Sequence, residues 1–235
     1  VGLAEELDAL LVAFDDPAAI YAACETPRAD RTAAPRPSGG DALMLLLWTA
    51  ARVNDALSFT ERAYNGETLI YRQTKTRRVV EVPVLGPLAD RLPAMQRRRR
   101  AQWGDAAPDE LVVNEDDGAP YWRLTAKGVR YHRPFNDLWR ERRTLAGLIA
   151  PSLVGDGVDR LGDPLPAFNA QDCRDTAVTR LMEAGCDIFQ IASWHGSDPK
   201  DILDLVKHYI AIGPDKAREA GDKLIAHARE NGISV

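Results

Sequence analysis

The feature that most constrains the fold is a long apolar segment between Asp41 and about Phe59. It contains the run Ala42–Trp48, the longest apolar stretch of the chain, and no Pro or Gly interrupts it. The run is much shorter than the roughly 18 apolar residues of a membrane-spanning helix. A helix that is apolar around most of its circumference is buried in a protein core. The sequence therefore predicts one long, central core helix over residues 41–59.

A β-hairpin is predicted directly after this helix. Glu67–Gln73 and Val79–Val84 have strand composition, and the polar turn Thr74–Arg78 between them carries Lys75 at its tip. The remaining patterns are mostly helical, with one further short strand at 111–113. Helices are predicted over residues 3–14, 17–24, 85–101, 125–148, 170–184, 187–193, 200–209 and 214–230. The fold class is thus mainly α with a small β-hairpin or sheet (α+β).

Charge is distributed unevenly along a chain whose net charge is −5. Residues 1–50 hold three basic and eight acidic side chains, whereas residues 72–143 hold sixteen basic and ten acidic ones. The second stretch includes the run Arg97–Arg100 and has a net charge of +6. The distribution of charge over the surface matters more than the net charge for attracting a polyanion. A basic face on an acidic protein is therefore expected.

The cysteines and the N-terminus indicate the compartment. The three cysteines have neither metal-ligand spacing nor the pattern of a disulfide framework, which favours a reducing environment. No signal peptide and no membrane-spanning segment is recognisable in the sequence. We expect a cytoplasmic, nucleoid-associated protein that does not contact membranes.

Several far-apart polar residues suit attack on a phosphodiester without a metal. Fixed arginines stabilise the charge that builds on the phosphate oxygens, and Arg52 and Arg174 are the candidates. A deprotonated Tyr hydroxyl is an adequate nucleophile, and Tyr209 is the candidate among the six tyrosines. The leaving oxygen needs a proton donor, typically Lys or His, and Lys75 and His195 are residues of these two types.

Each of these residues also has a purely structural interpretation. Arg52 could pair with Asp55 one turn on, and Arg174 could pair with Asp172 or Asp175. Lys75 could be an exposed turn lysine, and His195 could be a structural histidine. Tyr209 shares helical spacing with Leu203 and Val206, which would make it a core aromatic side chain.

Five short segments together resemble the tyrosine recombinases, the phage-integrase family. The segment TAARVND (49–55) resembles the pattern T-G-x-R-x-x-E, with the Gly assigned to Ala51 and the Glu to Asp55. DCRDTAVT (172–179) resembles the second arginine box, H-x-L-R-[HG]-T-x-x-T. The other three are TKTRRVVEVP at the hairpin, WHGS (194–197) and the His-Tyr pair at 208–209. The resemblance runs from about residue 41 to 230.

The resemblance implies a fold, a reaction and a set of roles. The fold would be the tyrosine-recombinase catalytic domain, and the reaction site-specific DNA recombination. Tyr209 would attack the scissile phosphate and form a 3′-phosphotyrosyl link. Arg52 and Arg174, with His195 and Gln171, would hold the phosphate, and Lys75 would protonate the leaving oxygen. Arg77, Arg78 and Trp194 would contact DNA, and no metal or other cofactor would be needed.

Two departures from the family pattern leave an alternative open. Gln171 stands where the family has His, and an amide cannot exchange a proton near neutral pH. The family's G-H-S order is replaced by Trp194-His195-Gly196-Ser197, so Trp194 is an alternative phosphate contact. A catalytically impaired, DNA-binding descendant is therefore the alternative to an active recombinase. Topoisomerase-like relaxation of supercoils uses the same chemistry and is a third possibility.

Domain organisation and partners follow from the same resemblance. Residues 1–40 are expected to be a helical segment and linker, the remnant of a missing DNA-binding domain or the link to one. Residues 41–235 would be the catalytic domain. The opening Val1 favours a catalytic fragment of a longer protein. Double-stranded DNA is the expected partner. We expect the protein to bind it as a homo-oligomer, a tetramer, and to be able to exist as a monomer in the absence of DNA.

Overall fold

The computed structural model describes residues 36–147, 169–207 and 214–231. The helices predicted over residues 3–14 and 17–24 lie outside these ranges. So do residues 1–35 of the expected N-terminal segment, and the division of the chain near residue 40 stays a prediction.

The described residues are mainly helical with two small antiparallel β-hairpins, which confirms the predicted fold class. The chain order of the helices and strands is as follows: α3 (Pro37–Thr49), α4 (Val53–Ala56), β1 (Thr68–Arg72), β2 (Val79–Pro83), α5 (Pro87–Trp103), β3 (Arg123–Leu124), β4 (Arg130–Tyr131), α6 (Arg133–Gly147), α7 (Asp172–Glu183), α8 (Ile188–His195), α9 (Pro199–Val206) and α10 (Pro214–Glu230).

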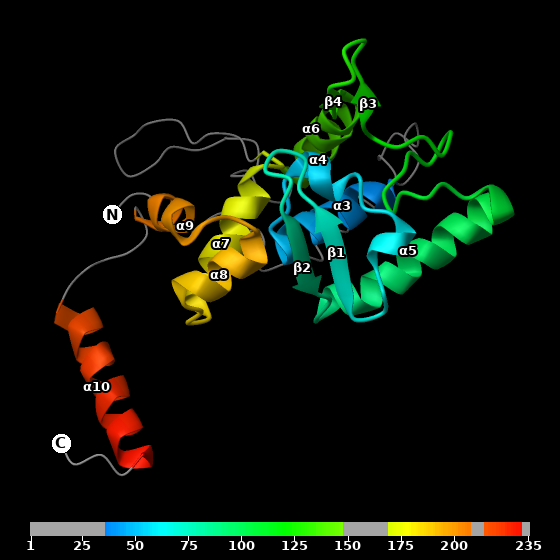
Figure 1. Cartoon of the computed structure of the whole chain (residues 1–235). Coiled ribbons are helices and arrows are strands. Elements are labelled where there is room, and N and C mark those ends of the chain that lie inside the picture. Colours follow the sequence, from blue (N-terminus) through cyan, green and yellow to red (C-terminus); the bar gives the residue numbers. More distant parts are fainter. Residues whose placement is uncertain (1–35, 148–168, 208–213, 232–235) are drawn as a thin grey trace.

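Helix α3 lies at the centre of the fold, as its composition predicts. Leu45 and Leu46 are completely buried, and α3 packs against α5, α6 and α7. The β1–β2 hairpin covers another side of this core, and α7, α8 and α9 lie together beyond it (Figure 1). A buried helix surrounded in this way holds the segments on either side of it in fixed positions.

The predicted helix over residues 41–59 is wrong in its extent, because the chain breaks at Ala50. Helix α3 begins at Pro37 and ends at Thr49, and Ala50 then adopts the left-handed conformation with φ 51°. The Thr49 hydroxyl donates to Leu45 O at 2.6 Å and accepts from Ala51 N at 3.2 Å. The side chain thus competes with the helical backbone. Helix α4 starts after the break and has Arg52 at its N-cap.

The β1–β2 hairpin has the predicted position. Thr68 pairs with Pro83 and Arg72 with Val79, and the inward side chains Leu69 and Val82 are fully buried. Residues 73–78 form the turn, so Lys75 lies at the tip.

The helix predicted from Thr125 is wrong at its start. Residues 123–131 form the β3–β4 hairpin, and α6 begins only at Arg133. The Thr125 hydroxyl accepts from Val129 N at 3.0 Å, and Gly128 has φ 73°, so Thr125 stabilises a turn rather than a helix N-terminus. The strand predicted at 111–113 is reduced to a single bridge between Val113 and Pro120.

The arginine run at the end of α5 serves the fold more than a basic surface. Arg98 bonds the buried carboxylate of Asp41 on α3, to which Arg91 also donates at 2.6 Å. Arg99 and Arg100 both bond Glu61. Buried charges need such partners. The run Arg97–Arg100 therefore adds less to a basic face than its sequence indicates.

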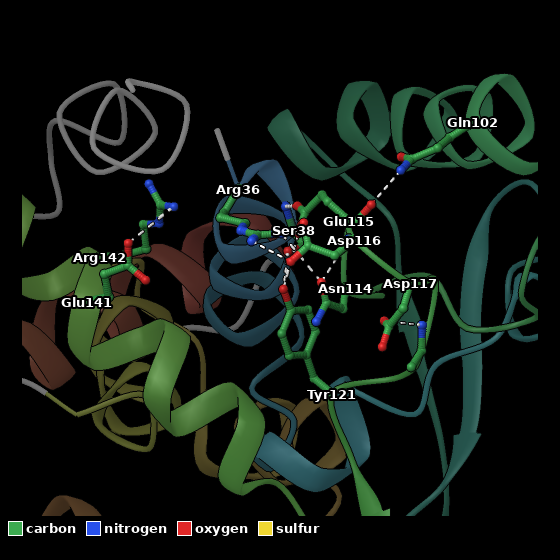
Figure 2. Close-up of polar contacts among 11 residues, drawn as sticks. Arg36, Ser38, Gln102, Asn114, Glu115, Asp116, Asp117, Tyr121, Glu141 and Arg142 are labelled. Atoms are coloured by element: carbon green, nitrogen blue, oxygen red, sulfur yellow. Dashed lines mark hydrogen bonds and ion pairs between the residues drawn. The ribbon is translucent and has the colours of Figure 1, made fainter. Parts of the chain in front are cut away.

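An acidic loop caps the start of α3. Glu115 accepts from Ser38 N at 2.7 Å, and Arg36 donates to Asp116 at 2.6 Å (Figure 2). The Tyr121 hydroxyl is 3.0 Å from Ser38 Oγ in the same network. A carboxylate at a helix N-terminus satisfies free N–H groups and complements the helix dipole. These contacts anchor α3 and hence the break that follows it.

No helix in the described part of the chain has the length and apolarity to cross a bilayer.

Candidate active site

A pocket of about 240 Å³ collects side chains from four separate stretches of the chain. Arg52 and Asp55 come from α4 and its N-cap, Lys75 from the β1–β2 turn, and Gln171 and Arg174 from α7 and its N-cap. The remaining lining residues are Ala51, Val53, Asn54, Thr74 and His132. Two arginines and one lysine in a single pocket suit an anionic ligand.

Arg52 is held by the hairpin and not by the acidic residue next to it. Its Nη1 donates to Gln73 Oε1 at 3.1 Å. Among the described residues Arg52 and Asp55 form no ion pair. Asp55 is buried and instead accepts from the N–H of Thr74 at 2.8 Å and from its hydroxyl at 2.6 Å. It thereby fixes the turn that carries Lys75.

The conformation at Ala50 fits the Gly of the T-G-x-R pattern that residues 49–52 resemble. Counted from Arg52 in T-G-x-R, that position is Ala50, and the assignment of the glycine to Ala51 is wrong. Ala50 has φ 51°, a region that Gly adopts without steric cost. The break of α3 at this residue aims Arg52 away from the core.

Gln73 is a positioning residue that sequence reasoning missed. It is completely buried at the end of β1, and its Nε2 donates to the backbone oxygen of His195 at 2.9 Å. Its Oε1 accepts from Arg52, so one amide joins the two halves of the site. The signal was a polar residue in an otherwise alternating strand, at a position where alternation points inward.

Arg174 lies nearly buried on α7 and is bound to His195. Its Nε donates to His195 Nε2 at 2.6 Å, and its Nη2 donates to His195 O at 3.2 Å. The pairs with Asp172 or Asp175 that the sequence allowed are not formed. Burial, and then the charge of Arg52, lower the pKa of Arg174 to about 10, so the guanidinium remains charged at neutral pH.

One nitrogen of Arg174 remains without a ligand. Its Nη1 is buried and has no hydrogen-bond partner among the described residues. A buried, unpaired donor on a cation is costly unless a ligand binds it. Because the charge of Arg52 contributes to the lowered pKa of Arg174, an anion between the two side chains would offset that effect.

His195 is buried behind Arg174 and neutral. Burial, followed by the charges of Arg174 and Arg52, lowers its pKa to about 3. Its Nε2 accepts from Arg174 Nε, and its Nδ1 lies 2.8 Å from Ser197 Oγ and 3.1 Å from Arg174 Nη2. Both ring nitrogens are therefore engaged. In this arrangement His195 orients Arg174, and it does not line the pocket.

Gly196 allows α8 to end against the hairpin. It has φ 70°, and a Cβ there would lie 2.3 Å from Val80 Cγ2 and 2.5 Å from Gln73 Nε2. Only Gly fits this approach. The inverted order Trp194-His195-Gly196 thus has a physical reason, since the Gly follows the His as the left-handed cap of α8.

The residues expected to contact DNA lie in two different parts of the structure. Arg77, with φ 61°, and Arg78 lie with Lys75 on the exposed hairpin turn, and Arg78 donates to Asp198 at 2.6 Å. Trp194 lines another pocket, with Trp48 and Arg180, away from Arg52. Tyr209 and His208 lie outside the described residues, beyond the end of α9 at Val206.

The sequence matches no protein-family model and no curated protein. Solved structures of low sequence identity have the same fold. A Tn1549 transposon integrase in complex with transposon right-end DNA has a TM-score of 0.60 at 14% identity, over 90% of this chain and 64% of that one. XerA recombinase has a TM-score of 0.52 at 14% identity, over 89% of this chain and 62% of that one.

The lambda integrase catalytic core has a TM-score of 0.50 at 17% identity, over 77% of this chain and 88% of that structure. The chain therefore has the fold of a tyrosine-recombinase catalytic domain, as the sequence predicted. It spans less than two thirds of the length of the transposon integrase structures that it matches.

Proposed function

Because the chain has the tyrosine-recombinase catalytic fold, we propose that it cleaves and rejoins DNA strands in site-specific recombination, through a 3′-phosphotyrosyl intermediate. The observation that carries the proposal is the convergence of Arg52, Lys75, Gln171 and Arg174 on one pocket. The two most distant of them in sequence, Arg52 and Arg174, are more than one hundred positions apart. A purely structural role for each would not require them to meet.

In the proposed reaction the two arginines bind the non-bridging oxygens of the scissile phosphate. The free Nη1 of Arg174 and the guanidinium of Arg52 supply fixed donors where negative charge builds up. The amide of Gln171 adds a neutral hydrogen bond. His195 and Gln73 are positioning residues, since each holds an arginine and neither lines the pocket.

The covalent steps conserve the bond energy. Tyr209 Oη attacks phosphorus, a P–O bond to the tyrosine forms, and the P–O bond to the 5′-oxygen breaks. The leaving oxygen takes a proton from Lys75, which lies at the exposed hairpin tip within the pocket wall. Rejoining is the reverse, with a 5′-hydroxyl as nucleophile, so the proposed reaction needs no cofactor.

The proposed partner is double-stranded DNA, bound by several copies of the chain. The Tn1549 integrase structures are complexes with DNA, and lambda integrase has been solved as a tetramer on a Holliday junction. By analogy we propose a homo-tetramer on DNA and a monomer in its absence. Arg77 on the hairpin and Trp194 on α8 remain proposed DNA contacts.

The test is a suicide cleavage assay. Because the target site is unknown, the substrate is a pool of nicked duplexes with randomised sequence around the nick, and covalent protein–DNA species are recovered under denaturing conditions. The proposal predicts a covalent adduct that Tyr209→Phe and Arg174→Ala abolish. Binding to DNA without any adduct would instead support the non-cleaving descendant.

The role of Lys75 has its own test. A 5′-bridging phosphorothiolate leaves as a thiolate, which needs no proton donor because a thiol has a pKa of about 8.5. Lys75→Ala should therefore cleave the ordinary substrate poorly and the phosphorothiolate normally. Arg174→Ala should fail on both, because its phosphate contact is needed in either case. A Lys75→Ala variant that fails on both substrates would contradict a role as proton donor.

A further inference from the structure

We propose that His132 is the proton acceptor of this pocket, the residue that replaces the histidine missing at Gln171. The inference rests on the proposed function, and it adds a residue that the recombinase resemblance does not supply. His132 follows β4 directly, far in sequence from both arginine boxes.

The first observation is its location. His132 lines the 240 Å³ pocket with Arg52, Lys75 and Arg174. It also lines an adjoining pocket of about 340 Å³, which Asn136 and Arg140 of α6 border as well. The two pockets share three residues, Val53, His132 and Gln171. The imidazole of His132 and the amide of Gln171 thus lie at the boundary between the two pockets.

The second observation is how the ring is held. His132 Nδ1 is 2.7 Å from the side-chain oxygen of Asn54 on α4. An amide oxygen only accepts, so the neutral ring carries its hydrogen on Nδ1 and has its lone pair on Nε2. Nε2 has no hydrogen-bond partner among the described residues. The arrangement is that of an oriented base with an open acceptor nitrogen.

The other described histidines are unsuited to the role. Both ring nitrogens of His195 are engaged, by Arg174 and Ser197. His227 lies on α10, where its backbone oxygen accepts from Asn231, and it lines neither pocket. Within the described ranges only His132 combines a place beside Arg174 with an unoccupied lone pair.

The surroundings keep His132 in the form that accepts a proton. Burial lowers its pKa from the usual 6.5, so the ring is neutral at pH 7. The charged groups that face it across the two pockets are Arg52 and Asp55 of α4, Lys75 of the hairpin, Arg174 of α7 and Arg140 of α6. Four of these five are cations, which suits the binding of an anionic ligand beside the ring.

The proton balance of the step is simple. As the attacking hydroxyl oxygen forms its bond to phosphorus, its proton passes to His132 Nε2, while Lys75 gives a proton to the leaving 5′-oxygen. In the rejoining step the imidazolium returns the proton to the departing phenol oxygen. His132 and Lys75 thereby exchange roles between the forward and reverse reactions.

The experiment measures the rate of covalent adduct formation by the whole chain on the selected nicked substrate. His132→Gln should lower that rate by about 10²- to 10⁴-fold, the usual contribution of a general base. DNA affinity should stay unchanged, and a 5′-phosphorothiolate should not restore the rate, because the missing group acts on the nucleophile. Gln171→His in the same variant should restore much of it. His227→Gln is the matched control and should have no effect.

The pH profile is the second readout. In the wild-type protein the rate should fall as pH decreases through the ionisation of His132, below 6.5, and this acidic limb should be absent from His132→Gln. If His132→Gln keeps the wild-type rate and acidic limb, the inference is overturned while the proposed function stands. If the wild-type protein forms no adduct at all, the proposed function falls, and the inference falls with it.

Discussion

At the scale of single residues, the site depends on backbone conformations that composition does not reveal. The turn at Ala50 aims Arg52 out of the core, and the left-handed Gly196 lets Gln73 reach the end of α8. The identity of the cations could be predicted from spacing, because Arg52, Lys75 and Arg174 each fall in a recognisable segment. The support that Gln73 gives to Arg52 could not, since it depends on contacts between distant parts of the chain.

Ala50→Gly should change the stability of the protein little, whereas Ala51→Gly should lower it. At Ala50, relief of the left-handed conformation gains about 1–2 kcal/mol, which offsets about 0.5–1 kcal/mol for the added freedom of Gly in the unfolded chain and about 0.8 kcal/mol for the buried methyl group. Ala51→Gly is the matched control, because its methyl group is also fully buried and the substitution relieves no left-handed conformation. We therefore expect a free energy of unfolding close to wild type for Ala50→Gly and a loss of about 1–2 kcal/mol for Ala51→Gly, measured by urea denaturation. Equal losses in both variants would contradict the account of the helix break.

The buried His195 predicts a specific pH dependence of stability. Its pKa is about 3 in the folded protein and about 6.5 when unfolded, so the unfolded state binds more protons between these values. Stability attributable to His195 is therefore unaffected above pH 6.5 and falls by about 1.4 kcal/mol per pH unit below it. Urea denaturation at pH 7 and pH 5 should show a smaller loss in His195→Gln than in wild type. The exposed His227→Gln should behave as wild type; identical slopes in all three proteins would refute a neutral, buried His195.

At the scale of helices and strands, long patterns were predictable and junctions were not. The β1–β2 hairpin and α5, α7, α8 and α10 have nearly the predicted bounds, because each has a clear period or a cap. The helix over residues 41–59 divides at Ala50, where the Thr49 hydroxyl accepts from the backbone N–H of Ala51. Residues 123–131 form a hairpin because Thr125 and Gly128 make a turn. Such short-range competition leaves little trace in hydrophobic periodicity.

The junction between α8 and the hairpin can be tested through Gly196→Ala. The new methyl group would meet Val80 and Gln73 at 2.3 and 2.5 Å, in addition to the strain of φ 70°. We expect a loss of about 2–4 kcal/mol in the free energy of unfolding. Gly185→Ala has a similar φ of 81° but open space around its Cβ, so it should lose only about 1–2 kcal/mol. DNA cleavage should be impaired in Gly196→Ala alone, and an equal effect of both substitutions would show that the close approach is unimportant.

At the scale of the whole molecule, two observations bear on the proposed binding of DNA. The chain spans 64% of the transposon integrase structure it resembles, and part of its arginine content is committed to internal ion pairs with Asp41 and Glu61. Each phosphate contact adds to affinity and to its salt dependence. We therefore expect binding of this chain alone to be weak and sensitive to salt. The pocket lined by Arg52, Lys75 and Arg174 lies within the described residues, whereas the proposed nucleophile Tyr209 lies outside them.

The most direct test of the central claim is to identify the protein atom that becomes linked to DNA. The covalent species from the nicked pool would be digested with nuclease and protease and analysed by mass spectrometry. The account predicts a nucleotide 3′-phosphate attached to Tyr209, lost in Arg52→Ala and Arg174→Ala. A nucleotide attached to any other residue, or an adduct that forms equally well without either arginine, would contradict it.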